Sequence, residues 1–341
     1  MNIQVFSPAD AAAWDGFVDR HPEANVFHRA GWKTAIEQSM EFSGHYLMAM
    51  DAGRVAGIYP FFVLATRLFG TLAVSVPYMS YGGVVADSAE AEQLLLAEAE
   101  RIARAAGCSY IELRQLYPLK TPLPTTDRKM VSEIPLDGGS EAVFRRLHQN
   151  VRNKIRKAGK NDVTVQVGAE HLPEFYDIYA RNLRDLGTPV ITRRIFEATV
   201  ATFPRQSLIY RAQRLGKTIA AKFVLRDGPA AYFTWSASLR ETLCYAPVHA
   251  MNWRAIEEAC AAGCTRIDFG TSTAESGSQE FKKYWGGESR TLPWAYQLFD
   301  RQDLPGLHKE NSSFSLAIAA WKRLPLGLSR LLGPPIARCL P

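Results

Sequence analysis

The nine residues AAGCSYIEL at 105–113 return as AAGCTRIDF at 261–269. In both places an Ala-rich run ends at a glycine, and a cysteine, two less apolar residues and an Ile-acid-apolar triplet follow. This pattern predicts a helix that is closed by glycine and leads into a short buried strand. The chain is therefore expected to use one helix–strand unit twice.

Two further pairs of segments support a duplication. DAGRVAGIYPFF (51–62) and RLGKTIAAKFVL (214–225) each place a Gly-basic pair at a predicted hairpin tip before an apolar strand. The offset is 216 − 53 = 163 for these glycines and 264 − 108 = 156 for the cysteines of the first pair, a drift that one loop-length difference absorbs. The amphipathic segments at 9–22 and 172–187 precede the two hairpins in the same order.

Each copy thus reads strand, helix, hairpin, helix, strand, an order typical of mixed α/β units of about 140 residues. The predicted fold class is α/β (mixed α+β), with two tandem domains and mixed sheets. The expected domains are 1–138 and 139–302, and a basic, Pro/Leu-rich amphipathic tail follows at 303–341.

The composition, with 47% hydrophobic and 22% charged residues, is that of a globular protein. No basic and apolar leader opens the chain and no run of 18 apolar residues occurs, so a cytoplasmic location is expected. The five cysteines are odd in number; Cys260 and Cys264 have the spacing of a metal pair, but no His or acidic cluster completes a site. Core packing is the favoured role of the cysteines, and no metal is predicted.

The segment 144–160 is rich in Lys and Arg and holds no acidic residue. A helix over 143–158, with Ser140 as its N-cap, would bury an apolar stripe and leave its flanks cationic. The stripe consists of Val143, Leu147, Val151, Ile155 and Ala158. A phosphate or acidic-polymer site and a solvated face both remain open for this helix, and no nucleic-acid motif accompanies it.

A polar loop after the second strand leads into a short helix with the sequence FKKYW. At 100° per residue, Tyr284 and Trp285 share a face with Phe281, Lys282 lies at the border of that face, and Lys283 faces water. A lysine at such a border can direct its ammonium at a developing oxyanion or simply extend its charge to the surface. His249 is open to two similar readings, as a base and as a partly buried structural residue.

With NVRNKIRKAGKNDVTV (150–165) and DFG…SG…FKKYWGG (268–287) in place, the chain resembles FemAB-type proteins of the tandem GNAT acyltransferase superfamily. The resemblance covers nearly the whole chain and is strongest to the FemAB-like proteins encoded with exosortase and exopolysaccharide genes. It implies two GNAT-like domains and transfer of an acyl or aminoacyl group onto an amine, in cell-envelope or exopolysaccharide synthesis.

The resemblance also implies roles for particular residues. Phe281-Lys282 matches a Phe-Lys pair whose lysine stabilises the oxyanion or contacts the donor, and Arg152 and Arg156 match basic positions near the phosphates of the acceptor. VFHRAGWKTA (26–35) resembles a Q..W segment, with His28 in place of Gln, which argues against a nucleotide-linked peptidoglycan acceptor. Lys282 is thus the expected catalytic residue, and the expected substrate-binding residues are Arg152, Arg156, Phe281, Trp32, His28, Asp268 and Tyr284.

The resemblance leaves the donor open between acyl-CoA, acyl carrier protein and aminoacyl-tRNA, none of them tightly bound. No segment between 160 and 205 is long enough for the helical arm associated with transfer RNA in some members. The expected acceptor is an anionic envelope precursor or polysaccharide. The alternative from another class is a non-catalytic module that binds an anionic polysaccharide or lipid head group through the cationic face.

In the tail, leucines between 324 and 332 and Ile336 alternate with four basic residues around Pro325 and Pro334–Pro335. Because proline interrupts a helix, we expect turn-broken rather than continuous helix here. Two interpretations remain open. The leucines either pack onto the second domain or form a weak anchor that contacts the inner membrane peripherally.

Overall fold

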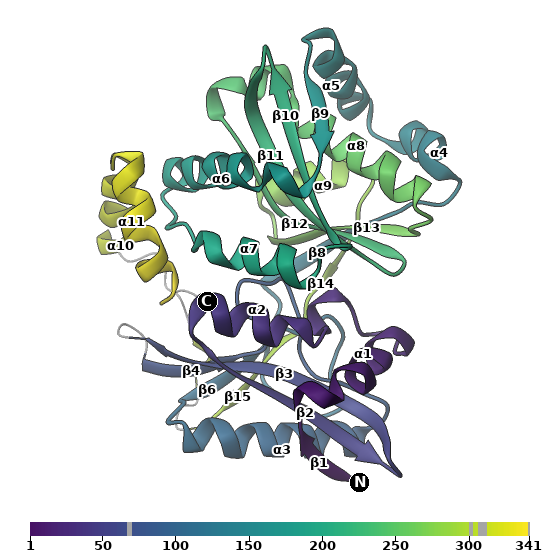
Figure 1. Cartoon of the computed structure of the whole chain (residues 1–341), viewed down its shortest axis with the longest axis vertical. Coiled ribbons are helices and arrows are strands. Elements are labelled where there is room, and N and C mark those ends of the chain that lie inside the picture. Colours follow the sequence, from purple (N-terminus) through teal and green to yellow (C-terminus); the bar gives the residue numbers. More distant parts are fainter. Residues whose placement is uncertain (67–69, 300–302, 306–311, 340–341) are drawn as a thin grey trace. The chain divides into compact units, whose positions relative to one another are not determined.

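The computed structural model describes residues 1–66, 70–299, 303–305 and 312–339 (Figure 1). Residues 300–302 of the predicted second domain, and 306–311 and 340–341 of the predicted tail, lie outside the described residues. The chain forms two compact units. One contains Met1–Lys129 and the segment that begins at Thr291, and the other contains Met130–Arg290 and the last two helices.

The first unit is built on a mixed sheet of order β1-β2-β3-β4-β6-β15-β7, with β5 beside β3. Its elements are β1 (Asn2–Val5), α1 (Ala11–Arg20), α2 (Gly31–Met40), β2 (Ser43–Asp51), β3 (Arg54–Thr66), β4 (Gly70–Val74), β5 (Val85–Ala86), α3 (Ala89–Ala105), β6 (Tyr110–Leu113), β7 (Thr125–Thr126) and β15 (Trp294–Leu298).

The second unit is built on a mixed sheet of order β14-β8-β13-β12-β11-β10-β9. Its elements are β8 (Lys129–Pro135), α4 (Gly139–Arg146), α5 (Gln149–Lys160), β9 (Thr164–Val167), α6 (Leu172–Leu186), α7 (Arg193–Thr202), β10 (Ser207–Arg214), β11 (Lys217–Asp227), β12 (Ala230–Ser238), α8 (Pro247–Ala261), β13 (Arg266–Thr273), α9 (Gly277–Tyr284), β14 (Glu288–Thr291), α10 (Ser312–Lys322) and α11 (Leu326–Ala337). Both sheets are mixed, as predicted.

The two hairpins that the sequence paired have the same construction. Ala52–Gly53 and Leu215–Gly216 each turn the chain with two residues at positive φ, the geometry of a tight two-residue hairpin loop. A register shift lies at the same distance before each turn, between Ala49 and Met50 in β2 and between Ala212 and Gln213 in β10. A bulge repeated at one position confirms that the hairpins are copies of one unit.

The repeated helix–strand unit is also confirmed. Gly107 and Gly263, at φ 74 and 78, close α3 and α8. In each case the following cysteine donates its backbone N–H into the last turn, Cys108 to Ala103 and Cys264 to Ala259, both at 2.9 Å. The two thiols are buried, with exposed fractions of 4% and 7%, as expected for core cysteines.

Each sheet contains a strand from the other half of the chain. β15 pairs with β6 in the first sheet, although it follows the second copy of the repeat. β8 lies beside β13 in the second sheet, although it follows the first copy. The sequence repeat did not indicate this reciprocal exchange of strands.

The prediction of one continuous helix over 143–158 is wrong. Leu147 leaves the helical conformation at ψ 143, and α4 and α5 are separate helices. His148 begins the second one, since its ring nitrogen accepts the N–H of Asn150. Ser140 is not an N-cap either, because Gly138 occupies that position with φ 77. The predicted apolar stripe is nevertheless buried or half-buried throughout.

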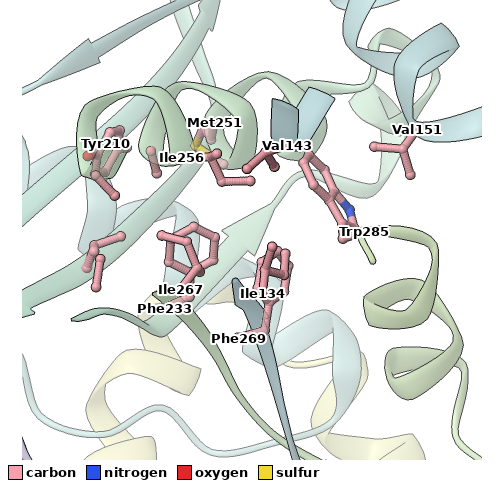
Figure 2. Close-up of a cluster of buried hydrophobic side chains, with 14 of the residues drawn as sticks. Ile134, Val143, Val151, Tyr210, Phe233, Met251, Ile256, Ile267, Phe269 and Trp285 are labelled. Carbon is pink, nitrogen blue, oxygen red and sulfur yellow. The ribbon is translucent and has the colours of Figure 1, made fainter. Parts of the chain in front are cut away.

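The second sheet is covered on both faces. Figure 2 shows the layer beneath α8, where Met251 and Ile256 of the helix pack on Ile267, Phe269 and other strand residues. On the opposite face an aromatic cluster joins α6 and α7 to the sheet. Its members are Phe175, Phe196, Phe223 and Trp235.

The tail packs on α6 of the second unit. Arg184 donates to the carbonyl of Leu324 at 2.9 Å, and Arg330 pairs with Asp177 at 2.7 Å. α11 continues through Pro334 and Pro335, whereas the chain breaks between α10 and α11 next to Pro325. Of the helices that the structure describes, none is both long and apolar enough to cross a membrane.

Candidate functional site

Helix α9, which presents Lys282, is set by local signals. Ser276 is its N-cap and accepts the backbone N–H of Gln279, whose side chain in turn accepts the N–H of Glu275. These contacts satisfy donors that the first turn leaves unpaired. Gly286, at φ 76, ends the helix. The orientation of α9 is therefore fixed at both ends, and with it the direction of Lys282.

Lys282 is buried, with 5% of its surface exposed, while its neighbour Lys283 is exposed as predicted. Its Nζ donates to the backbone carbonyls of Gly270 at 2.7 Å and Thr271 at 2.9 Å, within β13 but beyond its pairing with β12. An ammonium has three N–H donors. In the part of the chain that the structure describes, no third acceptor contacts this Nζ, so one donor is left for a ligand oxygen.

Asp268 fixes the backbone of the β13 segment that Lys282 contacts. It is 2% exposed, and its Oδ1 accepts the N–H of Gly270 at 2.6 Å. Gly270 lies within β13 but has φ 68, so the strand needs there a residue that tolerates the left-handed region. The carboxylate therefore fixes the backbone at Gly270, whose carbonyl accepts from Lys282.

The two groups influence each other's protonation. Burial raises the pKa of Asp268 to about 6, against the opposing effects of the Gly270 N–H and of the charges of Lys282 and Arg290. Burial lowers the pKa of Lys282 to about 8, and the carboxylate of Asp268 limits the fall. At neutral pH the site therefore holds an Asp carboxylate and a Lys ammonium with a readily lost proton.

Three rings of α8 and α9 form an aromatic cluster. The ring centroids of Phe281 and Trp285 are 6.2 Å apart, and His249 of α8 lies 5.4 Å from the first and 5.8 Å from the second. Burial, with a smaller effect of the Lys154 charge, lowers the pKa of His249 to about 4, so its ring is neutral at pH 7. Tyr284, predicted to share this face, is instead 38% exposed.

Two buried polar groups, one at the end of α9 and one in β13, have no hydrogen-bond partner among the described residues. They are Nε1 of Trp285, which is 0% exposed, and Oγ of Ser272, which is 7% exposed and follows Thr271. Buried polar groups are normally paired. Both groups are therefore unsatisfied donors on the two elements, α9 and β13, that position Lys282.

The basic helix begins beside this site. The backbone N–H of His148 donates to the carbonyl of Tyr284 at 3.1 Å, and the two rings lie 4.8 Å apart. On α5, Arg152 donates to the carbonyl of Arg145, and Arg156 lies 5.6 Å from the ring of Phe144. The structure thus connects the arginine helix to the helix of Lys282.

The predicted residues of the first unit are buried and hydrogen-bonded there. Trp32 is 0% exposed and donates to the carbonyl of Val26 at 2.8 Å. His28 is 2% exposed, and its Nδ1 accepts the N–H of Asn25 at 3.2 Å. Burial lowers the pKa of His28 to about 4. Their roles in substrate binding stay predictions.

Sequence reasoning missed Lys222, which lies in the middle of β11 with 3% of its surface exposed. Its signal was available, since a single lysine interrupts the apolar run TIAAKFVL. Ala220 and Val224, two residues on either side, belong to the core beneath α8. The strand period of two therefore placed this lysine on the inward face. No group of three or more His, Cys, Asp or Glu side chains gathers as a metal site in the described ranges.

Comparisons with known proteins agree with this architecture. Residues 145–283 match the family model of the acetyltransferase (GNAT) domain. No curated protein matches the chain. Among solved structures, FemX has a TM-score of 0.72 at 16% identity, over 88% of this chain and 98% of its own.

Two more distant structures have the same fold. L-PGS from Bacillus licheniformis has a TM-score of 0.56 at 10% identity, over 96% of this chain and 97% of its own. A tandem GNAT protein from the clavulanic acid biosynthesis pathway has a TM-score of 0.55 at 10% identity, over 89% and 99%. The chain therefore has the tandem GNAT fold that its resemblance to FemAB-type proteins implied.

Proposed function

We propose that this chain, which has a tandem GNAT fold and a GNAT domain at 145–283, is an N-acyltransferase. In this reaction the amine of an acceptor attacks the carbonyl carbon of an activated acyl or aminoacyl donor. The bond to the donor's leaving group then breaks, and an amide is formed. Lys282 is the proposed catalytic residue, because an oxyanion develops on the carbonyl oxygen during the attack.

The observation that carries this proposal is the arrangement of acceptors around Lys282 Nζ. Carbonyls of Gly270 and Thr271 hold two of its protons, at 2.7 and 2.9 Å, so the position of the ammonium is fixed before a substrate arrives. A preorganised donor of this kind stabilises developing charge without moving at the moment of reaction. The low exposure of the side chain strengthens the interaction, since water screens it little.

The acceptor that the site favours carries an amine and a negative charge. Arg152 and Arg156 lie on α5, whose start contacts α9, so they would bind the anionic part of an acceptor whose amine points at the site. An amine-bearing precursor of the cell envelope or of an exopolysaccharide has this chemistry. Acyl-CoA, acyl carrier protein and aminoacyl-tRNA are the donor classes to be distinguished.

The experiment is a donor panel with one defined acceptor. Purified protein is incubated with acetyl-CoA, lauroyl-CoA, lauroyl acyl carrier protein or alanyl-tRNA, together with glucosamine 6-phosphate as an anionic amine, and products are identified by mass spectrometry. An acylated amine supports the proposal and removes the alternative of a non-catalytic binding module. Salt-sensitive binding of an anionic polysaccharide without consumption of any donor would favour that module instead.

Replacing both Arg152 and Arg156 by Gln is expected to raise KM for glucosamine 6-phosphate about tenfold and to leave kcat nearly unchanged. The reason is that these charges bind the acceptor's phosphate but do not touch the reacting carbonyl. The rise of KM with added salt should also become weaker. Steady-state kinetics at two salt concentrations measure both effects.

The control for this pair is Arg205→Gln, which removes an exposed charge of the same unit outside α5. It should leave KM unchanged. An unaltered KM in the double variant, or an equal rise in the control, would show that the cationic face of α5 does not bind the acceptor.

The tail packs on the second unit and also exposes apolar side chains. α11 buries Ser329, Gly333 and Ala337, and the tail is held on α6 through Arg184 and Arg330. Large apolar side chains nevertheless stay exposed on α10 and α11, next to the exposed Lys322 and Arg323. These exposed side chains are Leu316, Ile318, Leu328, Leu331, Leu332 and Ile336. We infer that the outer face contacts an anionic lipid surface peripherally.

The variant Leu331→Ser with Leu332→Ser is expected to lose sedimentation with vesicles of phosphatidylglycerol and phosphatidylcholine at low salt. These leucines are 69% and 44% exposed, so the change removes apolar contact with lipid and leaves the packing on α6 intact. Leu215→Ser, at a hairpin tip and 76% exposed, is the matched control and should sediment like the wild type. Equal behaviour of all three proteins, or concentration-dependent self-association instead of lipid binding, would contradict the inference.

A further inference from the structure

Lys222 is a buried lysine without a polar partner. It is 3% exposed and lies on β11 between Ala220 and Val224, both members of the core beneath α8. Within the described residues, no hydrogen bond or ion pair reaches its Nζ. An ammonium in such a place would lose its hydration and gain no acceptor, which is costly. The ring face of Phe233, 3.7 Å from Nζ, offsets only part of this cost. The surroundings of Lys222 therefore favour the neutral amine.

The amine lies where two strands of the sheet separate. Parallel pairing of β12 with β13 ends at Tyr232 and Asp268, and the next residues are Phe233 and Phe269. Lys222 Nζ is 3.7 Å from the first of these rings and 5.7 Å from the second. Figure 2 shows both rings in the layer beneath α8, on the side where Trp285 lies. Phe269 directly precedes Gly270 in β13, and the carbonyl of Gly270 accepts from Lys282.

The two lysines of the site have opposite environments. Burial lowers the pKa of Lys222 well below its ordinary value, and the charge of Lys282 on α9 lowers it further. Lys282 has two carbonyl acceptors and the nearby Asp268 of β13, whereas Lys222 has none. Among the titratable groups on α8, His249 lies against Trp285 and Glu258 accepts from the hydroxyl of Tyr210. Where the environments of two titratable groups push their pKa values apart, one group can act as the acid and the other as the base.

We infer that Lys222 is the general base of the proposed acyl transfer, a catalytic residue that contacts the acceptor amine. The inference rests on the proposed function. As the amine nitrogen bonds to the carbonyl carbon, one of its protons passes to Lys222 Nζ, and the C=O electron pair moves onto the oxygen that Lys282 stabilises. When the intermediate collapses, the bond to the donor's sulfur or oxygen breaks. Lys222 then returns the proton to that leaving group and is neutral again.

A nucleophilic role for Lys222 fits the chemistry less well. Its attack on a thioester or ester would produce an amide on its own side chain. Transfer from that amide to the acceptor would exchange one amide for another and would lose the driving force of the activated donor. An acyl group found on Lys222 during turnover would therefore contradict the role as base.

The first test is the variant Lys222→Met, whose unbranched apolar side chain suits a buried site. With the donor that the panel identifies and glucosamine 6-phosphate, kcat is expected to fall at least about 100-fold while KM changes little. Lys217→Met, on the exposed end of the same strand, is the matched control and should turn over like the wild type. A thermal melt of each variant checks that the fold is intact.

The second test needs no substrate. The side-chain nitrogens of the whole protein are labelled with ¹⁵N-lysine, and the Lys222 signal is assigned by its absence in Lys222→Met. A neutral amine at pH 7 is expected, and an ammonium at pH 7 would overturn the inference. So would full turnover by Lys222→Met while the wild type acylates the probe. If the wild type consumes no donor of the panel, the proposed function fails and the role of Lys222 falls with it, whatever the protonation state.

Discussion

Replacing Lys282 by alanine is expected to lower kcat by about 10²–10³-fold, the usual cost of losing one oxyanion donor. The loss should appear in kcat and kcat/KM alike, because the interaction with the oxyanion exists only in the transition state. The measurement is steady-state acyl transfer with the donor that the panel identifies.

Two controls separate this effect from damage to the fold. Lys283→Ala removes the adjacent, exposed lysine and should leave kcat unchanged. Lys282→Ala also leaves the carbonyls of Gly270 and Thr271 without their donor, so a lower melting temperature is expected, by an amount equivalent to about 1–3 kcal/mol. Rates are therefore compared well below the melting transition. Full turnover in the alanine variant would show that Lys282 only supports the strand end.

The rate of the wild type is expected to fall as pH rises above about 8. Burial lowers the pKa of Lys282 to about 8, and only the protonated lysine stabilises an oxyanion. Above this pH the protonated fraction decreases tenfold per unit, and kcat should follow it. The profile of kcat between pH 6 and 10 at saturating acceptor measures the effect, since saturation removes the contribution of acceptor binding.

The variant Lys282→Arg tests the assignment of this alkaline limb. Arginine stays charged throughout the range, so any activity that the variant keeps should no longer decline near pH 8. If the decline persists unchanged in Lys282→Arg, another group is responsible for it. Asp268 is not expected to cause it, because burial raises the pKa of that carboxyl only to about 6, and it is already ionised at pH 8.

Local chemistry explains which parts of the site could be predicted. Lys283 was expected to face water and does so, because the position of a side chain around a helix follows from the residue count alone. The break between α4 and α5 at Leu147–His148 was missed, because the apolar stripe continues across it. The sign of the break is His148, which caps the start of α5. The residue count placed Tyr284 on the aromatic face of α9, but its ring lies against the ring of His148 instead.

The surroundings of Lys222 and Lys282 could not be predicted from local sequence patterns. Lys282 was expected at the border of an apolar face, yet it is buried with two carbonyl acceptors from β13. Asp268 fixes the backbone at Gly270, which supplies one of these carbonyls. Lys222 comes from a strand about 60 residues earlier in the chain, and its charge state depends on Lys282. Such coupling arises only when distant segments share one low-dielectric space.

The sequence by itself determined that one unit of helix, hairpin and strand occurs twice. Glycines at positive φ and short apolar strands are local requirements, and they leave a similar pattern at 105–113 and 261–269. Only the tertiary structure decided that β8 and β15 exchange sheets and that the charge of Lys282 on α9 acts on both Lys222 of β11 and Asp268 of β13. The physical reason is that strand pairing and burial join residues far apart in the chain, and no local pattern records which distant partner satisfies a strand edge or surrounds a charge.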